Sequence, residues 1–373
     1  MTEAGRFALL PRLWIKPALG TLLYEALDAA IDTAERRSAG PISALDAGCG
    51  RVSALRAFRP RIVPTPTDAS SGGESWLVDG TYIGKARNVG HDTARESREM
   101  EDITARLQHM DELDIDVQVL YPTIFLRPFT RRPDVELAVT RSYNRWLIDI
   151  WKKAPERLRW VAVLPLLSMD KAIEEARFAK ENGACGIFMR GLEGDKRISD
   201  SHFFPIYEEA GRLDMPICVH SAIGSFVVHE YFLDECGFNK FKLAVVGSFH
   251  SLIFNRIPEK FPNTRWAFIE VSSQWVPYAI HDFARRFERS GVKVDKSEVL
   301  RKNKIWVTCQ TDDDLPYVLK YAGDDMLVIG TDYGHNDTSS EILALRKLKE
   351  DGSVPPHVVN KILDNNARAL YGL

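Results

Sequence analysis

The chain has 373 residues, of which 45% are hydrophobic and 27% charged, so it is long enough to bury a large core. Its formal net charge of −3 excludes the basic field that nucleic acid or anionic lipid would need. No run approaches the about 20 apolar residues of a membrane span. The five cysteines are scattered and predict reduced thiols: Cys49, Cys185, Cys218, Cys236 and Cys309. The sequence therefore predicts a cytoplasmic protein with a small-molecule substrate and with no membrane or nucleic-acid partner.

The N-terminal part of the chain is dominated by one amphipathic pattern. In residues 18–38, leucine and isoleucine recur at helical spacing, and Gly40 follows as a stop signal. Residues 64–74 are rich in Pro, Gly and Ser and predict a polar loop. We expect a helical extension over residues 1–41 and one α/β domain over residues 42–373.

Apolar runs and helical patterns then alternate along the chain. Two of the predicted helices are residues 170–183 and 208–213. The predicted strands are eight runs: 42–48, 115–122, 158–165, 184–189, 215–220, 264–271, 304–310 and 326–333. Such alternation implies a parallel sheet with helices outside it. Eight units over this length predict a (β/α)8 TIM barrel.

Groups with metal-binding and catalytic chemistry stand at the predicted carboxyl ends of these strands. They are His220, Glu270 and Asp332, with Tyr121 and Arg190 at two further ends. Active sites of TIM barrels lie at this end, and an imidazole with two carboxylates suits a divalent metal. Each residue also has a purely structural interpretation: a hydrogen-bonded histidine, a carboxylate that caps a turn, or an arginine in an ion pair.

The segment LDAGCG at 45–50 has two interpretations. It resembles the Gly-rich turn of an S-adenosylmethionine methyltransferase, with Asp68 placed as a ribose-binding acid. Against this, Val52 replaces the third glycine, and Pro64 and Pro66 would break the second strand. A lone Gly-rich turn is weak evidence. The further β/α units favour the other interpretation, in which the segment is the first strand of a barrel.

Several longer segments resemble the amidohydrolase-2 family, the group related to aminocarboxymuconate semialdehyde decarboxylase. The matching segments are MDELDIDVQVLYPT (110–123), MPICVH (215–220), FPNTRWAFIEVSSQWVPY (261–278), VIGTDYGH (328–335) and ILDNNARALYGL (362–373). The resemblance covers roughly residues 100–373. It implies a TIM barrel with a divalent metal at its mouth that decarboxylates or hydrolyses a small carboxylated substrate.

The resemblance also implies roles for particular residues. His220 and Asp332 match metal ligands of the family, and Glu270 stands where relatives place a pocket-facing His or Glu. His335 follows the aspartate as it does in many relatives. In this interpretation Glu270 or His335 moves protons and Arg190 binds a carboxylate. We expect the metal to be zinc, with iron and manganese as the alternatives.

One departure from the family pattern affects both the metal site and the function. The first-strand His-x-His is absent, because Gly48 and Gly50 stand at its positions. His220 and Asp332 alone fall short of the three protein ligands of a catalytic zinc. Besides solvent, the candidates to complete the shell are Glu270, His250, His335 and the Cys49 thiolate.

An altered first strand also opens a second functional class. The chain would suit the role of an accessory, metal-binding subunit in a two-subunit metal-dependent hydroxylase similar to 2-aminoisobutyric acid hydroxylase. The apolar stripe of residues 18–38 either closes the bottom of its own barrel or packs on another chain. We therefore expect a homo-oligomer, or a hetero-oligomer with a related amidohydrolase-like chain.

Overall fold

The computed structural model describes residues 61–64, 74–84, 88–90 and 92–373. The predicted helix at 18–38, the predicted strand at 42–48 and Cys49 lie outside the described residues. Seven parallel strands form the central sheet, in the order β12-β11-β10-β9-β6-β5-β4. Their bounds are β4 (Gln118–Leu120), β5 (Leu158–Val163), β6 (Ala184–Arg190), β9 (Ile217–His220), β10 (Trp266–Ile269), β11 (Ile305–Cys309) and β12 (Leu327–Ile329).

These strands confirm the predicted parallel α/β barrel fold, and each lies within or within one residue of a predicted run. The sheet is curled, so that its two end strands approach each other. Thr123 follows β4 and His335 follows β12, yet Thr123 Oγ1 lies 3.2 Å from His335 Nε2. The curl therefore brings the loops after the first and last described strands to one mouth.

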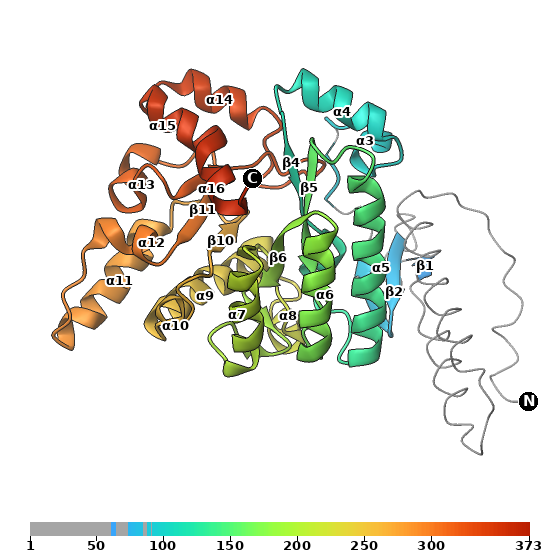
Figure 1. Cartoon of the computed structure of the whole chain (residues 1–373), viewed down its shortest axis with the longest axis horizontal. Coiled ribbons are helices and arrows are strands. Elements are labelled where there is room, and N and C mark those ends of the chain that lie inside the picture. Colours follow the sequence, from blue (N-terminus) through green and yellow to red (C-terminus); the bar gives the residue numbers. More distant parts are fainter. Residues whose placement is uncertain (1–60, 65–73, 85–87, 91) are drawn as a thin grey trace, which may run out of the picture.

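Helices cover the outside of the sheet. Figure 1 shows α5, α6 and α7 standing side by side along one flank, and α11 to α16 along the other. The longer helices are α4 (Ile103–Glu112), α5 (Pro133–Trp151), α6 (Met169–Glu181), α7 (Phe204–Arg212), α9 (Leu243–Phe254), α11 (Val276–Arg289), α13 (Leu315–Ala322) and α14 (Ala344–Asp351). The short ones are α3 (Arg95–Arg98), α8 (Phe226–Tyr231), α10 (Ile257–Lys260), α12 (Val299–Lys302), α15 (Pro356–Asn360) and α16 (Asn366–Tyr371).

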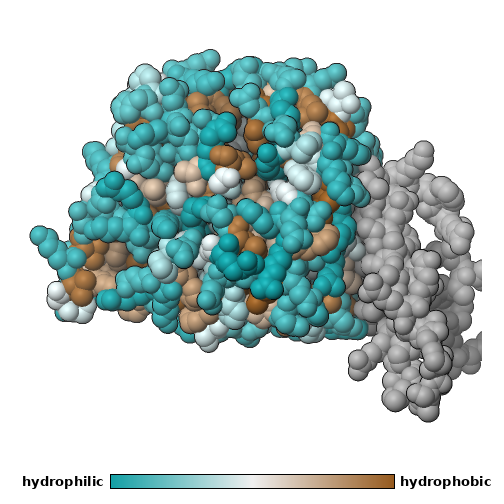
Figure 2. Space-filling view, in the orientation of Figure 1, coloured by the Kyte–Doolittle hydropathy of each residue, from teal (hydrophilic) through white to brown (hydrophobic). Residues whose placement is uncertain are grey.

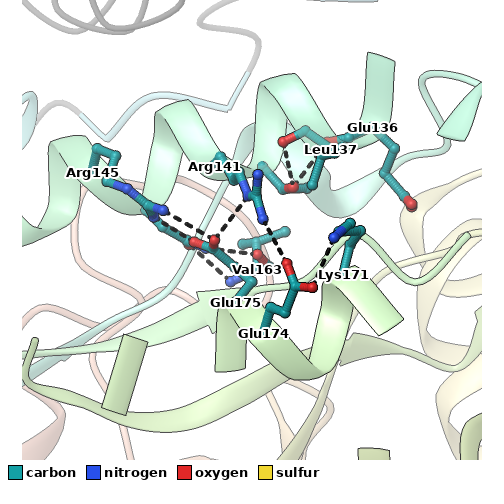
Figure 3. Close-up of polar contacts among 10 residues, drawn as sticks. Glu136, Leu137, Arg141, Arg145, Val163, Lys171, Glu174 and Glu175 are labelled. Carbon is teal, nitrogen blue, oxygen red and sulfur yellow. Dashed lines mark hydrogen bonds and ion pairs between the residues drawn. The ribbon is translucent and has the colours of Figure 1, made fainter. Parts of the chain in front are cut away.

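One buried carboxylate joins two of these helices to the sheet. Glu175 on α6 is 1% exposed. Its carboxylate forms ion pairs with two arginines of α5, with Arg145 Nη1 at 2.5 Å and Arg141 Nε at 3.2 Å (Figure 3). Asn144 Nδ2 donates to the same carboxylate and to the carbonyl of Val163 at the end of β5. A buried charge needs such pairing, so this network fixes how α5 and α6 lie against the sheet.

Two small antiparallel elements accompany the barrel. β1 (Arg61–Pro64), β2 (Glu74–Val78) and β3 (Thr81–Gly84) form a three-stranded sheet, and β7 (Leu192–Glu193) pairs with β8 (Lys196–Arg197). The turn from β2 to β3 is Asp79-Gly80, and both residues have positive φ. An Asp-Gly pair at a two-residue hairpin is a strong local signal, so this hairpin was readable from the sequence.

The surface of the face in Figure 2 is mainly hydrophilic, with apolar residues in small groups. This pattern follows from helices that turn their apolar sides to the sheet. Among the described residues, no helix combines the length and apolar character needed to cross a membrane.

Candidate active site

His220 ends β9 and lies at the barrel mouth, 3% exposed. Its ring lies between those of Tyr121 and Phe188, at centroid distances of 5.2 and 5.8 Å. Its Nε2 lies 3.0 Å from Glu270 Oε2. Burial lowers the pKa of His220, but the Glu270 and Asp332 carboxylates, with the Ser221 carbonyl, together outweigh burial, so the net pKa is raised. The ring thus packs against two aromatic rings, with one nitrogen aimed at a carboxylate.

Glu270 follows β10 and is part of the same buried group. Burial raises the pKa of its carboxyl, and the nearby charge of Asp332 raises it further, while His220 acts in the opposite direction. Two carboxylates that face each other in a buried site repel, so the ionised pair needs positive charge beside it.

Asp332 follows β12 and organises the loop behind it. Its Oδ1 lies 2.7 Å from His335 Nδ1, and its Oδ2 accepts a hydrogen bond of 2.7 Å from the Ser340 hydroxyl. Burial lowers the pKa of His335, but the hydrogen bond and charge of Asp332 outweigh burial and raise it to about 9. His335 therefore carries a proton at neutral pH, with one ring nitrogen on Asp332 and the other near Thr123.

Two of the site carboxylates sit on unusual backbone. Glu270 has φ of 61° and Asp332 has φ of 49°, in the left-handed region that L-residues seldom adopt. Such strain persists only where the surroundings enforce it, and it clusters at functional sites. This signal was invisible in the sequence.

The donor set suits a divalent cation. One ligand atom each from Glu270, Asp332 and His335 lies within 4.8 Å of the others, and His220 touches the same Glu270. Imidazole nitrogens and carboxylate oxygens are the donors that zinc, manganese and iron accept. A cation here would also relieve the repulsion between the two buried carboxylates, so the residues fit a metal.

A hydroxyl pair lies beneath the site. Tyr121 follows β4, and its hydroxyl is 2.6 Å from that of Tyr371 at the end of α16. Burial raises the pKa of both phenols, and Cys218 lies beside them. The sequence pattern places Tyr121 at a strand end but indicates no role for Tyr371, because nothing local to α16 shows that this side chain reaches Tyr121.

Arg190 lies at the end of β6, and its guanidinium donates hydrogen bonds to a carboxylate and to backbone carbonyls of the chain itself. Its Nε and Nη2 contact the carboxylate of Glu193, at 3.0 and 2.5 Å. Its Nη1 donates to the backbone carbonyls of Phe125 and Arg127. The guanidinium thus ties the hairpin after β6 to the loop after β4, which is the ion-pair role that the sequence analysis gave as the structural alternative.

The structure does not bring His250 to the cluster. It lies on α9, with its Nε2 3.2 Å from Asp282 of α11 and its ring stacked on Phe254. Of the residues expected from the sequence, His220, Glu270, Asp332 and His335 therefore converge, whereas His250 stands between outer helices.

A parallel α/β barrel with a His/carboxylate cluster at the carboxyl ends of its strands defines the class of metal-site barrel hydrolases and lyases. Residues 91–373 match the amidohydrolase family (Amidohydro_2), and the chain belongs to that family. This match confirms the resemblance seen in the sequence.

The similar proteins share less than a quarter of their residues with this chain at aligned positions. The chain is 24% identical over 251 residues to a 2-amino-3-carboxymuconate-6-semialdehyde decarboxylase of Dictyostelium discoideum; the match covers 62% of the chain and 66% of that relative, just under two thirds. Among solved structures, an amidohydrolase of Mycobacterium avium subsp. paratuberculosis K-10 superposes with a TM-score of 0.70 at 18% identity, covering 86% of this chain and 92% of that one.

A second solved structure is a dihydroxybenzoic acid decarboxylase of Polaromonas sp. JS666 with bound manganese and the inhibitor 2-nitroresorcinol. It gives a TM-score of 0.59 at 18% identity, covering 74% of this chain and 88% of that one. At such identities the two solved structures establish the shared fold.

Proposed function

We propose that this chain is a metal-dependent decarboxylase of a small carboxylated substrate. The observation that carries the proposal is the convergence of Glu270, Asp332 and His335 within 4.8 Å at the carboxyl ends of parallel strands, with His220 Nε2 3.0 Å from Glu270. The reaction is proposed because the Dictyostelium and Polaromonas relatives are named as decarboxylases.

We further propose that His220, Glu270 and Asp332 hold the metal. Both ring nitrogens of His335 already face protein oxygens, so His335 is left for proton transfer. A divalent cation would supply Lewis-acid stabilisation of the negative charge that develops on the substrate. Zinc is our first choice, with manganese and iron as alternatives; the manganese of the Polaromonas relative supports a metal of this kind.

His335 is the proposed proton donor. Loss of CO₂ breaks a carbon–carbon bond and leaves the electron pair on the substrate carbon, which must then take up a proton. In the metal-free site the pKa of His335 is raised to about 9, so the ring carries a proton at neutral pH before a metal binds. Asp332 and Thr123 fix the orientation of its ring. Arg190 is proposed here as a positioning residue for the two loops it joins, in place of the substrate contact expected from the sequence.

The test uses the full chain, stripped of metal and reloaded separately with zinc, manganese and iron. CO₂ release from a panel of carboxylated aromatic acids is measured for wild type, His335→Gln and His250→Gln. We expect turnover with at least one metal, a loss of about 10²-fold or more in His335→Gln, and no change in His250→Gln. Metal bound at full stoichiometry without CO₂ release from any acid would contradict the proposal.

The accessory-subunit function is the second candidate, favoured by Gly48 and Gly50 at the positions of the family's first-strand ligands. An isolated chain without turnover that gains it only beside a co-expressed related barrel would establish it. The division into residues 1–41 and 42–373, an oligomer formed through residues 18–38, and a cytoplasmic location remain proposals. Light scattering of the full chain and of a chain that lacks residues 1–38 tests the oligomer.

A further inference from the structure

A cavity of about 200 Å³ lies among the loops that follow β4, β5, β6 and β9. It is distinct from the metal cluster, because none of the four converging site residues lines it. Two buried aromatic side chains, Phe129 and Phe203, form part of its wall, and Glu136 contributes a carboxyl group. The cavity thus combines apolar rings with a buried acid.

Glu136 is an acidic residue of this wall that forms no ion pair with a described residue. It stands in the first turn of α5 and is 6% exposed, and its Oε2 accepts a hydrogen bond of 2.7 Å from the Leu167 amide. Figure 3 shows its carboxylate turned away from the ion pairs that Arg141 and Arg145 make on the same helix. Within the described part of the chain, no basic side chain forms an ion pair with Glu136.

The other charged groups of the wall form ion pairs or are exposed. Arg190 is paired with Glu193 at 2.5 Å. Arg131 is paired with Asp195 at 2.7 Å and covers one face of Phe226, at 4.4 Å from the ring centroid.

Two further wall groups complete the charge balance. Lys196 is exposed on β8, and His202 Nε2 donates to the carbonyl of Leu166. Among the described residues of the wall, Glu136 is therefore the carboxylate without an ion-pair partner.

Several groups act on the ionisation of Glu136. Burial is the largest influence and raises the pKa of this carboxyl to about 7; the Leu167 amide and the charge of Arg190 lower the pKa, and the charge of Glu193 raises it. The N-terminal end of a helix favours a negative charge in its first turn, and Glu136 occupies such a position on α5. A positively charged ligand would lower the pKa of Glu136 and so favour its ionised form, because opposite charges attract more strongly in a medium of low dielectric constant.

We propose that this cavity binds a small primary ammonium ion, with the Glu136 carboxylate as its counter-ion. The ammonium N–H groups donate to the carboxylate, and the alkyl part packs against Phe129 and Phe203, whose ring faces also attract a cation. The volume accommodates an amine of several heavy atoms, since a water molecule in the liquid takes about 30 Å³. The site is independent of the proposed decarboxylation, because it uses no residue of the metal cluster.

The experiment titrates the full chain with propylammonium chloride, with 1-propanol as the neutral isostere, at constant chloride and ionic strength. Binding is followed by calorimetry and by the rise in Tm. At pH 8.5 we expect saturable binding of propylammonium and no comparable binding of propanol. Affinity should fall at least fivefold between pH 8.5 and pH 6, as Glu136 takes up its proton.

The variant Glu136→Gln should weaken propylammonium binding at least tenfold. Its matched control is Glu174→Gln on α6, whose carboxylate is exposed and faces Lys171 and Arg141 (Figure 3). If Glu136→Gln fails to fold, Phe203→Leu and the pH profile of wild type decide the matter. Absence of saturable binding, equal binding of propanol, or unchanged affinity in a folded Glu136→Gln would each overturn the proposal.

Discussion

The hydroxyl of Tyr371, near the C-terminus, lies 2.6 Å from the hydroxyl of Tyr121, whose ring packs against His220. Residues about 250 positions apart thus form one connected group beneath the candidate metal site. The last helix, α16, is therefore linked through two tyrosines to the orientation of a proposed metal ligand.

Removing the hydroxyl of Tyr371 tests this link. Partners that orient a metal ligand typically contribute 10–100-fold in metal affinity, so Tyr371→Phe should weaken binding of cobalt or zinc by roughly tenfold. The cobalt absorption spectrum should shift as well. Tyr207→Phe is the control, because its buried hydroxyl donates to the Ile198 carbonyl away from the site. An unchanged metal affinity in Tyr371→Phe would show that ring packing alone holds His220.

Replacement of His220 by Ala should remove most of the bound metal, since a site with two carboxylates and no imidazole falls below the usual three protein ligands. His250→Ala should retain the wild-type stoichiometry, because His250 lies on α9 beside Asp282. Metal content of the two purified variants, measured by elemental analysis, checks both statements. Equal metal loss in the two variants would refute the assignment of His220.

Removing the negative charge of the buried Glu175 should lower the free energy of unfolding. In Glu175→Gln, two arginines and an asparagine of α5 lose the negative charge and one of the two oxygens that they share. Hydrogen bonds to a charged group are typically worth about 1.5–3 kcal/mol, so the free energy of unfolding should fall by that order. Glu174→Gln should change it by less than about 0.5 kcal/mol, because its ion pairs are exposed. Urea unfolding of both variants gives the comparison; similar midpoints would contradict it.

The stability of the metal-free chain should fall at alkaline pH. The pKa of His335 is raised from its ordinary 6.5 to about 9 by Asp332, so folding favours its protonated form. That contribution is complete below about pH 6.5 and is lost as the pH rises through about 9. Tm measured from pH 6 to pH 10 should decline in wild type and decline less in His335→Gln. Parallel profiles would argue against the Asp332–His335 pair.

The sequence by itself determined the parallel sheet and the position of the site. Continuous apolar runs such as 184–189 are buried on both faces, so they had to be interior strands. Because parallel strands end at one edge, the sequence pattern alone predicts that His220, Glu270 and Asp332 lie at the same mouth. The Asp79-Gly80 turn is likewise a local signal, since an Asp-Gly pair favours a two-residue hairpin.

Only the tertiary structure decided which side chains meet. Arg190 pairs with Glu193, His250 lies between outer helices, and Tyr371 enters the barrel from the far end of the chain. Local periodicity states which face of an element is buried, but not which distant residue it will contact. Those contacts depend on the curl of the sheet, which brings the ends of distant strands to one mouth. The left-handed backbone of Glu270 and Asp332 likewise appears only in the folded chain.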